Sequence, residues 1–343
     1  MSIRIEERRR AIERGLRLIY RLACDAEIFE EYGSDLLSCF YFTYATSKDP
    51  ELCRMARRMG EERARRWRSD FSSVPKDADV STILFFMHGT LSAEGLGFAD
   101  EPLKEEIRRA AGGFDAYDFL AFDPTAEPPP LDVPDVCECG YWNERGRKMC
   151  VQCRKRLLMA SRYRVWYEGL MMTYTAAHLG ISLGVSYADV LKWLPTLHPY
   201  RGRAGGENDD FYDSVYAVTH IVYTLNDYSV YRLKPSWLPQ EFEFLKASVE
   251  DAIALEDPEM LGEITDSLQA FGLKETHPLI RRGIDYLLSS QNADGSWGDA
   301  EPEDDIYAYY HSTWTAIDGL RQYPERPYGL SFPELKPLLK QLR

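Results

Sequence analysis

Apolar residues recur at three- and four-residue intervals along most of the chain, which is the spacing of amphipathic helices. Alternation of apolar and polar residues, which would indicate strands, is almost absent outside a cysteine-containing segment. Turn signals such as Ser-Lys-Asp-Pro at 47–50 and Asp257-Pro258 separate the helical segments. The pattern predicts an all-α protein with helices at about 8–24, 34–47, 50–68, 79–96, 102–112, 161–180, 186–194, 210–230, 239–254, 258–272, 277–290 and 305–322.

The predicted helices follow one another through short turns, in pairs of roughly 45–50 residues. Pairs of this length stack as αα-hairpins, either in an open solenoid or in a closed toroid. Periodicity alone does not separate these two architectures.

A proline-rich segment at 124–136 interrupts the helices, because proline lacks the backbone donor and crowds the preceding turn. We expect a stiff linker here. It divides the chain into N-terminal helical hairpins (1–123), the linker with the cysteine segment (124–157) and C-terminal helices (158–343). A loop rich in glycine and charge, 198–210, is either a surface loop or a lid.

The cysteine segment, CECGYWNERGRKMCVQCRKRL at 137–157, has the spacing of a metal site. Two cysteine pairs on tight turns would bring four thiolates to one tetrahedral centre: Cys137, Cys139, Cys150 and Cys153. Gly140 and Asn143 suit the turns after the first pair. The segment resembles the short zinc ribbon C-x-x-C-G-x-x-N…C-x-x-C, although its first pair, C-x-C, is one residue shorter. Four protein ligands leave no open position, so we expect a structural zinc.

Basic side chains surround these cysteines: Arg145, Arg147, Lys148, Arg154, Lys155 and Arg156. They would suit docking to an acidic protein partner or to nucleic acid. The alternative is a folding clip that closes a long insertion. The sequence leaves both open.

Near the C-terminus, Gln291, Gly295 and Trp297 form the pattern Q-x-x-x-G-x-W. This resembles the repeat of squalene–hopene and other triterpene cyclases, and more loosely that of protein prenyltransferase β subunits. In those families the motif joins an outer helix to the next inner helix of an α/α toroid, and the glutamine ties the chain to a neighbouring helix start. The resemblance therefore implies a toroid of helical hairpins, with an inserted zinc ribbon. It implies little about the reaction.

Three short fragments extend the resemblance. The stretch 213–216 resembles the Asp-x-Cys-Tyr that carries two zinc ligands in prenyltransferase β subunits, and 310–313 resembles their Tyr-His-Thr. Val215 replaces the cysteine, so protein prenylation is not expected. The stretch 77–80 resembles part of the D-x-D-D acid of the cyclases without its last aspartate, and Asp79 also suits a helix cap.

Several chemistry-bearing residues lie at similar distances from the starts of their predicted helices. In a toroid with parallel inner helices, equal distance from the start means equal depth, at about 1.5 Å per residue. We predict that four of them meet in one cavity: His220, His311, Glu168 and His88. Asp213 and Tyr174 are expected to support these residues or to act as additional ligands. His220, His311 and Glu168 are a ligand set for iron, copper or zinc with open positions. The alternatives are a metal-free pocket with a general acid and base, or structural core histidines.

The composition of the chain excludes some classes of function. The net charge of −14 argues against a nucleic-acid binder, because phosphate binding needs a basic field. The chain has 22 tyrosines, which suit either an aromatic-lined interior or helix–helix contacts. No apolar stretch approaches the roughly 20 residues that span a bilayer. With no signal-peptide core and four of seven cysteines at metal spacing, we expect a cytoplasmic protein.

We therefore predict an enzyme acting on an apolar or aromatic small molecule inside the toroid, by a metal ion or by general acid–base catalysis. One alternative is a scaffold that binds a protein partner through the zinc ribbon. Another is a diverged isoprenoid cyclase or prenyltransferase, which would need a basic pocket for a prenyl diphosphate. Candidate cations for that pocket are Arg201, Arg203, Arg281 and Arg282.

Overall fold

The computed structural model describes residues 3–131, 133–134, 137, 139, 141, 143, 147–157, 159–203 and 210–342. The described chain is mostly helical, so the all-α prediction is confirmed. Its strands are β1 (Val133–Pro134) and β2 (Met159–Ala160), which pair antiparallel. The helices are α1 (Ile3–Cys24), α2 (Ala26–Thr46), α3 (Pro50–Asp70), α4 (Val80–Gly95), α5 (Glu101–Ala111), α6 (Ala116–Leu120), α7 (Arg162–Leu179), α8 (Tyr187–Leu191), η1 (Leu194–Leu197), α9 (Asp210–Leu225), α10 (Pro239–Ala254), α11 (Pro258–Ala270), α12 (Pro278–Ser289), α13 (Ile306–Leu320), η2 (Pro333–Leu335) and α14 (Lys336–Gln341).

Aspartate caps set the starts of seven of the described α-helices. The Asp25 carboxylate accepts the backbone N–H groups of Glu27 and Ile28, so α2 begins eight residues before the predicted start at 34. Asp79 accepts the N–H of Thr82 at 2.8 Å, which confirms its place as the cap of α4. The predicted loop 198–210 includes residues 204–209, which lie outside the described residues.

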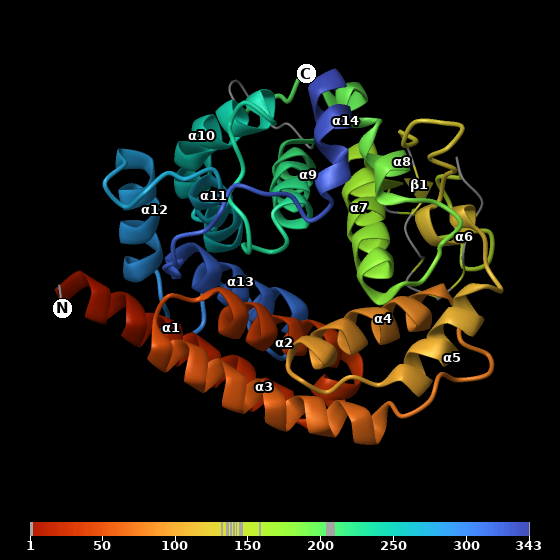
Figure 1. Ribbon diagram of the computed structural model, residues 1–343, viewed down its shortest axis with the longest axis horizontal. Coiled ribbons are helices and arrows are strands. Elements are labelled where there is room, and N and C mark those ends of the chain that lie inside the picture. The colour runs from red at the N-terminus through yellow and green to blue at the C-terminus, as the bar shows by residue number, and fades with distance from the viewer. Residues whose placement is uncertain are drawn as a thin grey trace.

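Six helices pack in a closed sequence: α2 on α4, α4 on α7, α7 on α9, α9 on α11, α11 on α13, and α13 on α2 (Figure 1). The remaining long helices pack against the outside of this set. α3 lies on α1 and α2, α5 on α4, α10 on α11, and α12 on α11 and α13. The N-terminal helices α2 and α4 therefore belong to the same closed set as the C-terminal helices.

The Q-x-x-x-G-x-W segment connects the end of α12 to the start of α13. The Gln291 amide donates to the carbonyl of Ala11 at 2.9 Å, in the middle of α1 rather than at a helix start. Trp297 is fully buried, and its indole N–H donates to the carbonyl of Leu287 in α12 at 2.7 Å. Gly295 has a φ of +104°, which favours glycine. The motif therefore fastens the C-terminal hairpin to the N-terminal helix.

The chain after α13 crosses the C-terminal ends of the packed helices. The Lys48 N–H, just past α2, donates to the carbonyl of Gln322 at 2.7 Å. The Ser331 N–H donates to the carbonyl of Leu225, the last residue of α9, at 2.9 Å. This segment covers the C-terminal end of the arrangement. In the part of the chain that is described, we find no helix with the length and apolar character needed to cross a membrane.

Candidate functional site

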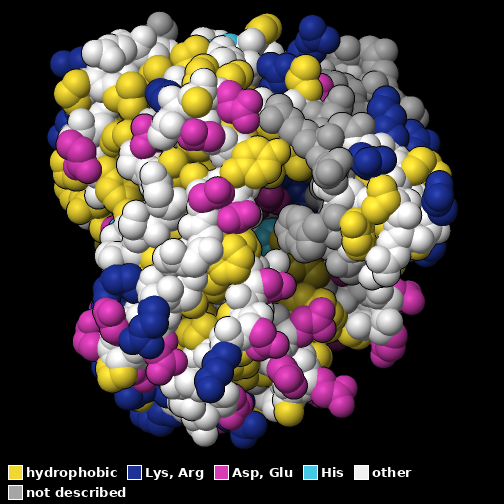
Figure 2. Space-filling view, turned by 90° about the vertical axis from the view of Figure 1, so that its right-hand side faces the viewer, with side chains coloured by type: hydrophobic (Ala, Val, Ile, Leu, Met, Phe, Trp, Pro, Cys, Tyr) yellow, Lys and Arg dark blue, Asp and Glu magenta, His cyan; other side chains and the backbone are white. Residues whose placement is uncertain are grey.

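A cavity of about 530 Å³ lies among the six packed helices, and each of them contributes lining side chains. Figure 2 shows the molecule hollowed on one face, with histidine inside the hollow and acidic side chains at its edge. Arg164 and Glu168, near the start of α7, keep about 40% of their side-chain surface exposed (42% and 39%), whereas Arg321, beyond the end of α13, keeps 2%. The cavity is therefore open toward the helix N-termini and closed at the C-terminal end.

The four residues predicted from helical depth line this cavity, and so do the two supporting residues: His220, His311, Glu168 and His88, with Asp213 and Tyr174. They come from α4, α7, α9 and α13. The charge and the hydrogen bonds of each side chain depend on its neighbours in the cavity.

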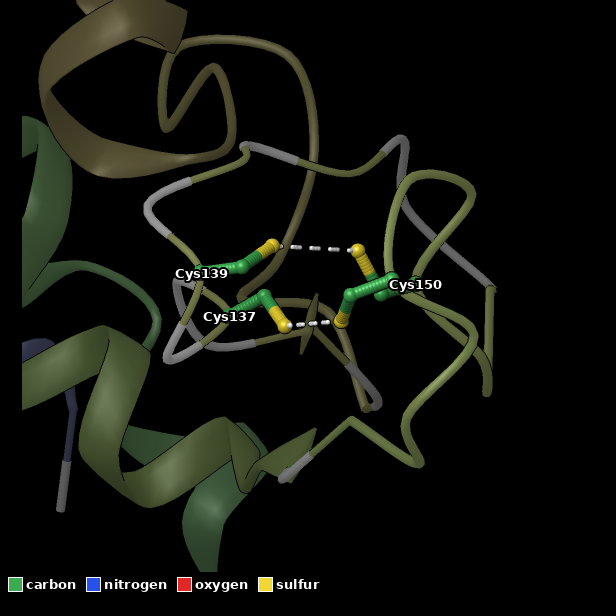
Figure 3. A group of neighbouring side chains, drawn as sticks. Cys137, Cys139 and Cys150 are labelled. Atoms are coloured by element: carbon green, nitrogen blue, oxygen red, sulfur yellow. Dashed lines mark hydrogen bonds between the residues drawn. The ribbon is translucent and has the colours of Figure 1, made fainter.

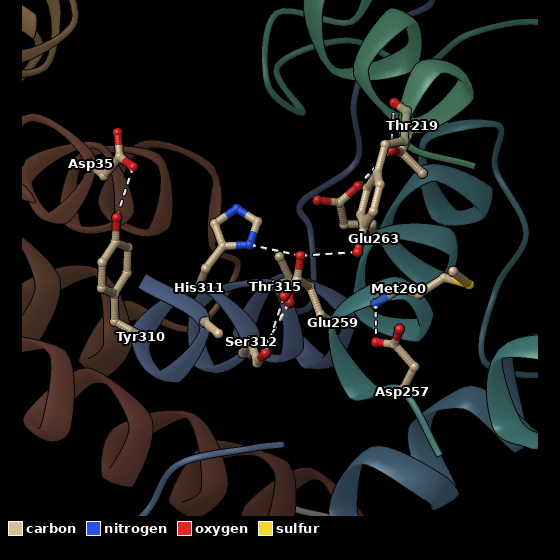
Figure 4. A network of polar contacts seen from close by, with 12 residues as sticks. Asp35, Thr219, Asp257, Glu259, Met260, Glu263, Tyr310, His311, Ser312 and Thr315 are labelled. Carbon is tan, nitrogen blue, oxygen red and sulfur yellow. Dashed lines mark hydrogen bonds and ion pairs between the residues drawn. The ribbon is translucent and has the colours of Figure 1, made fainter. Parts of the chain in front are cut away.

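His311 forms an ion pair with Glu259 of α11 (Figure 4). Its Nδ1 lies 3.0 Å from Glu259 Oε1. That oxygen also accepts the Tyr216 hydroxyl at 3.0 Å, and Oε2 accepts the Ser312 hydroxyl at 3.1 Å. Burial alone would lower the pKa of His311, but the nearby carboxylates, Glu259 first, raise it to about 9. Burial would likewise raise the pKa of Glu259, but His311 and the hydroxyl donors bring it to about 2. Both groups are charged at neutral pH.

Glu263 and His220 form a second pair with the opposite character. Glu263, one turn after Glu259 on α11, is 2% exposed, and burial raises its pKa to about 8. The Thr219 hydroxyl donates to its Oε2. Burial also lowers the pKa of His220 to about 4. Although His220 Nδ1 lies 3.9 Å from Glu263 Oε2, burial keeps the two side chains uncharged at pH 7.

The tautomer of His220 follows from its hydrogen bond. Its Nδ1 lies 2.7 Å from the carbonyl oxygen of Tyr216, which can only accept, so Nδ1 carries the proton. Nε2 then has a free lone pair. Tyr167 stacks on the imidazole with ring centres 4.7 Å apart. The ring is therefore held with its protonated Nδ1 toward the neutral Glu263 side chain, and Nε2 is its basic nitrogen.

Aromatic rings form much of the remaining wall. Tyr307 stacks on His311 at 4.9 Å, and Tyr228 lies between Phe42 and Tyr223, at 4.2 and 5.9 Å. This agrees with the aromatic-lined interior that the tyrosine content suggested. Such walls favour apolar, aromatic or cationic ligands.

The closed end of the cavity holds a buried polar cluster. Arg321 pairs with Asp318 at 2.8 Å. The Tyr323 hydroxyl donates to Asp266, the third acidic residue on the inner face of α11. Burial raises the pKa of Asp318 to about 7 despite Arg321. These contacts join the chain after α13 to the floor of the cavity.

The predicted metal set of His220, His311 and Glu168 is not assembled. Glu168 pairs with Arg164 on its own helix at 2.9 Å, and His311 pairs with Glu259. Among the described residues, one group of three or more His, Cys, Asp or Glu side chains has all its ligand atoms within 4.8 Å of one another, and it is elsewhere. A second metal ion stays a prediction, without support from this geometry.

That group is the predicted set Cys137, Cys139, Cys150 and Cys153. The Sγ atoms of Cys137 and Cys153 are 3.4 Å apart, and those of Cys139 and Cys150 are 3.6 Å apart (Figure 3). Tetrahedral zinc with Zn–S bonds of about 2.3 Å would space its sulfurs by about 3.8 Å. The four side chains fit a metal ion such as zinc, although the first pair is one residue short.

Local hydrogen bonds hold the two cysteine pairs together. The Asn143 amide donates to the carbonyl of Tyr141 and its Oδ1 accepts the N–H of Val151, both at 3.0 Å. This links the first pair to the second, as expected for a residue at the chain reversal. The described basic side chains around the site are exposed: Arg147, Lys148, Arg154, Lys155 and Arg156. Gly140 and Arg145 lie outside the described residues.

Comparison with known proteins gives no match to a family model, a curated protein or a solved structure. The likeness to cyclases and prenyltransferases thus rests on the Q-x-x-x-G-x-W segment and the short fragments alone. The function of the cavity is therefore inferred from the residues that line it.

Glu259 and Glu263 were not predicted from the sequence. A signal was present, since the two acids are four residues apart on one predicted helix, with apolar Met260, Leu261 and Ile264 beside them. An acidic residue in the first turn of a helix is expected from the helix dipole alone, so Glu259 gave no separate indication that it lines the cavity. Glu263, at the depth of His311, met the same criterion that selected the histidines.

Proposed function

We propose that this chain is an enzyme that carries out acid–base chemistry on an uncharged or cationic small molecule in the central cavity. The observation that carries this proposal is the pairing of Glu263 and His220. Burial raises the pKa of Glu263 to about 8 and lowers that of His220 to about 4, so the carboxyl group becomes the weaker acid of the two. A carboxylic acid and a free imidazole then coexist at neutral pH, which is how acid and base are assigned in a catalytic site.

We propose that the fold is an α/α toroid. Two independent features support this: the closed packing sequence of α2, α4, α7, α9, α11 and α13, and the Q-x-x-x-G-x-W segment between α12 and α13. In such an arrangement, six helices present one face each to a shared interior. The interior then has space for a ligand, with its opening at one end.

In the proposed mechanism, Glu263 donates a proton to the bound molecule and His220 Nε2 accepts one from another position. The charged pair of His311 and Glu259 stays fixed and stabilises negative charge that develops near the imidazolium. The acid and the base are restored when His220 releases the proton taken up at Nε2 and the Glu263 carboxylate regains one, by exchange with solvent through the open end of the cavity. Nδ1 keeps its proton on the Tyr216 carbonyl throughout. The net result is a proton shift within the substrate, and the aromatic wall selects an apolar or aromatic skeleton.

The charge of the lining disfavours the isoprenoid alternative. The described lining has two arginines, Arg164 and Arg321, and each is paired with a carboxylate. Seven carboxyl side chains face them: Asp35, Glu168, Asp213, Glu259, Glu263, Asp266 and Asp318. A diphosphate would meet this acidic surface without a free cation to bind it.

For the cysteine site we propose a structural zinc ion, because four thiolate ligands leave no position for a substrate. Zinc held by free thiolates suits a reducing compartment, so we propose that the protein acts in the cytoplasm. The exposed basic side chains around the site favour a second candidate function. They would dock an acidic protein partner there, with the cavity serving as a scaffold interior.

Catalysis is tested by incubating a small-molecule extract with the purified protein in D₂O and following each component by liquid chromatography–mass spectrometry, in which a proton shift appears as deuterium uptake or as a new retention time. We expect the wild type to convert at least one component. Glu263→Gln and His220→Gln should each slow that conversion by about 10²–10⁴-fold, because each removes one partner of the proton transfer. The matched control is Glu243→Gln, an exposed α10 residue, which should convert at the wild-type rate.

Two results would contradict the proposal. One is equal conversion by the wild type and Glu263→Gln. The other is no conversion by the wild type of any component in extracts that contain amines and neutral aromatics. The second result would favour the scaffold function.

A further inference from the structure

A second cavity, of about 420 Å³, lies outside the ring of six helices. It forms where the loop after α2, the connection from α11 to α12 and the chain after α13 meet. Two of its lining residues are acidic, Glu275 and Glu325, against five cationic ones: Arg8, Lys48, Arg232, Lys274 and Arg326. This is unusual in a chain with a net charge of −14, and opposite to the acidic central cavity.

Arg326 brings positive charge to this cavity, and no described carboxylate forms an ion pair with it, although Asp266 lies near enough to raise its pKa. It is 7% exposed, and its guanidinium donates to the carbonyls of Ser229 and Gln269, each at 3.0 Å. Carbonyl oxygens satisfy its hydrogen bonds without cancelling its charge. Burial lowers the pKa of Arg326, Tyr323 and Asp266 oppose this shift, and the neighbouring Arg321 and Arg232 add to it. A bound anion would relieve this repulsion.

Arg232 is held in a fixed position at the wall of the same cavity. Its Nη2 donates to the Tyr328 hydroxyl at 3.1 Å, and its guanidinium lies 4.7 Å from the centre of that ring. Its Nε is buried and has no hydrogen-bond partner in the part of the chain that is described. Gly272 leaves room for this guanidinium, since a Cβ there would lie 2.2 Å from Nη2. The guanidinium is thus held in place at the cavity wall.

We infer that this outer cavity binds a small molecule that carries a phosphate group. Arginine presents a planar fork of donors that matches phosphate oxygens, and the neighbouring lysines add positive charge. The volume is within the range of ligand pockets and exceeds that of inorganic phosphate alone, so the rest of the ligand would fill the remainder. The site is separate from the proposed catalytic cavity. The two share a wall through Tyr323, which lines the outer cavity and donates to Asp266 in the central one.

Titration calorimetry with inorganic phosphate, pyrophosphate and AMP, at constant ionic strength, tests this inference. We expect saturable binding of at least one of the three, at one equivalent per chain. Arg232→Gln and Lys274→Gln should each weaken it by tenfold or more, and exposed Lys274 can change without disturbing the fold. Two variants should bind like the wild type: Lys246→Gln, on α10 outside this cavity, and Glu263→Gln, in the central one.

Absence of saturable binding for all three probes would overturn the inference. So would binding that Arg232→Gln and Lys274→Gln leave unchanged. Equal weakening by Lys246→Gln would also overturn it, because this would show attraction to surface charge rather than to a built site.

Discussion

Replacing Glu263 by glutamine is expected to raise the free energy of unfolding at pH 8 by about 3 to 5 kcal/mol. The native carboxyl group stays neutral up to a pKa of about 8 because it is buried, whereas in the unfolded chain it ionises near 4.5. Its favourable contribution is therefore complete below about pH 4.5 and is lost as the pH rises to about 8. Glutamine accepts the same Thr219 hydroxyl but never ionises, so it escapes this loss.

Urea unfolding of the wild type and Glu263→Gln at pH 5 and pH 8 measures this effect. The gain in stability should be small at pH 5 and largest at pH 8. Glu243→Gln, whose side chain is 66% exposed, is the control and should show no such dependence on pH. An equal difference at both pH values would mean that Glu263 is ionised in the folded protein. A gain in stability with a loss of activity is the pattern of a strained catalytic group.

Replacing Cys150 by serine is expected to remove the bound metal, from one equivalent per chain to none. Cys150 is fully buried at the centre of the four-cysteine group, and three remaining thiolates no longer close a tetrahedral site. Structural zinc contributes about 10–16 kcal/mol to the folding of small zinc modules. Cys137, Cys150 and Leu157 form a hydrophobic cluster apart from the main core, so we expect local unfolding of 137–157 and an intact helical body.

Elemental mass spectrometry gives the metal content, and limited proteolysis with circular dichroism locates the unfolding. Cys24→Ser is the matched control, since Cys24 is exposed and outside the group. A full equivalent of metal in Cys150→Ser would refute the assignment of these ligands. Metal that remains bound in Cys150→Ser but is lost in His220→Ala or His311→Ala would instead support a second metal site in the central cavity.

Helical periodicity predicted most elements because long amphipathic helices repeat their pattern over several turns. α6 and α14 were not predicted, because five and six residues are too few to show a helical period. The four cysteines could be predicted as a group because their spacing along the chain fixes their geometry. The Q-x-x-x-G-x-W segment predicted a link between two helices, but not that Gln291 binds the middle of α1.

Helical depth predicted that His88, His220 and His311 face one cavity, because residues at equal height on parallel helices meet. The partners of these side chains were beyond the sequence. Whether His311 faces Glu168 or Glu259 depends on which helices are neighbours around the ring and on how each is rotated. The charge states depend on these partners, because burial lowers the pKa of both His220 and His311, and Glu259 raises only that of His311 to about 9.

The central claim is that Glu263 keeps its proton at neutral pH beside an uncharged His220. A pH titration of the glutamate side-chain carboxyl carbons by ¹³C NMR tests it most directly, with Glu263→Gln identifying the resonance. Our account predicts a single signal, missing in that variant, that titrates near pH 8. A Glu263 signal that titrates at the ordinary value near 4.5 would contradict the acid–base assignment and, with it, the proposed enzyme.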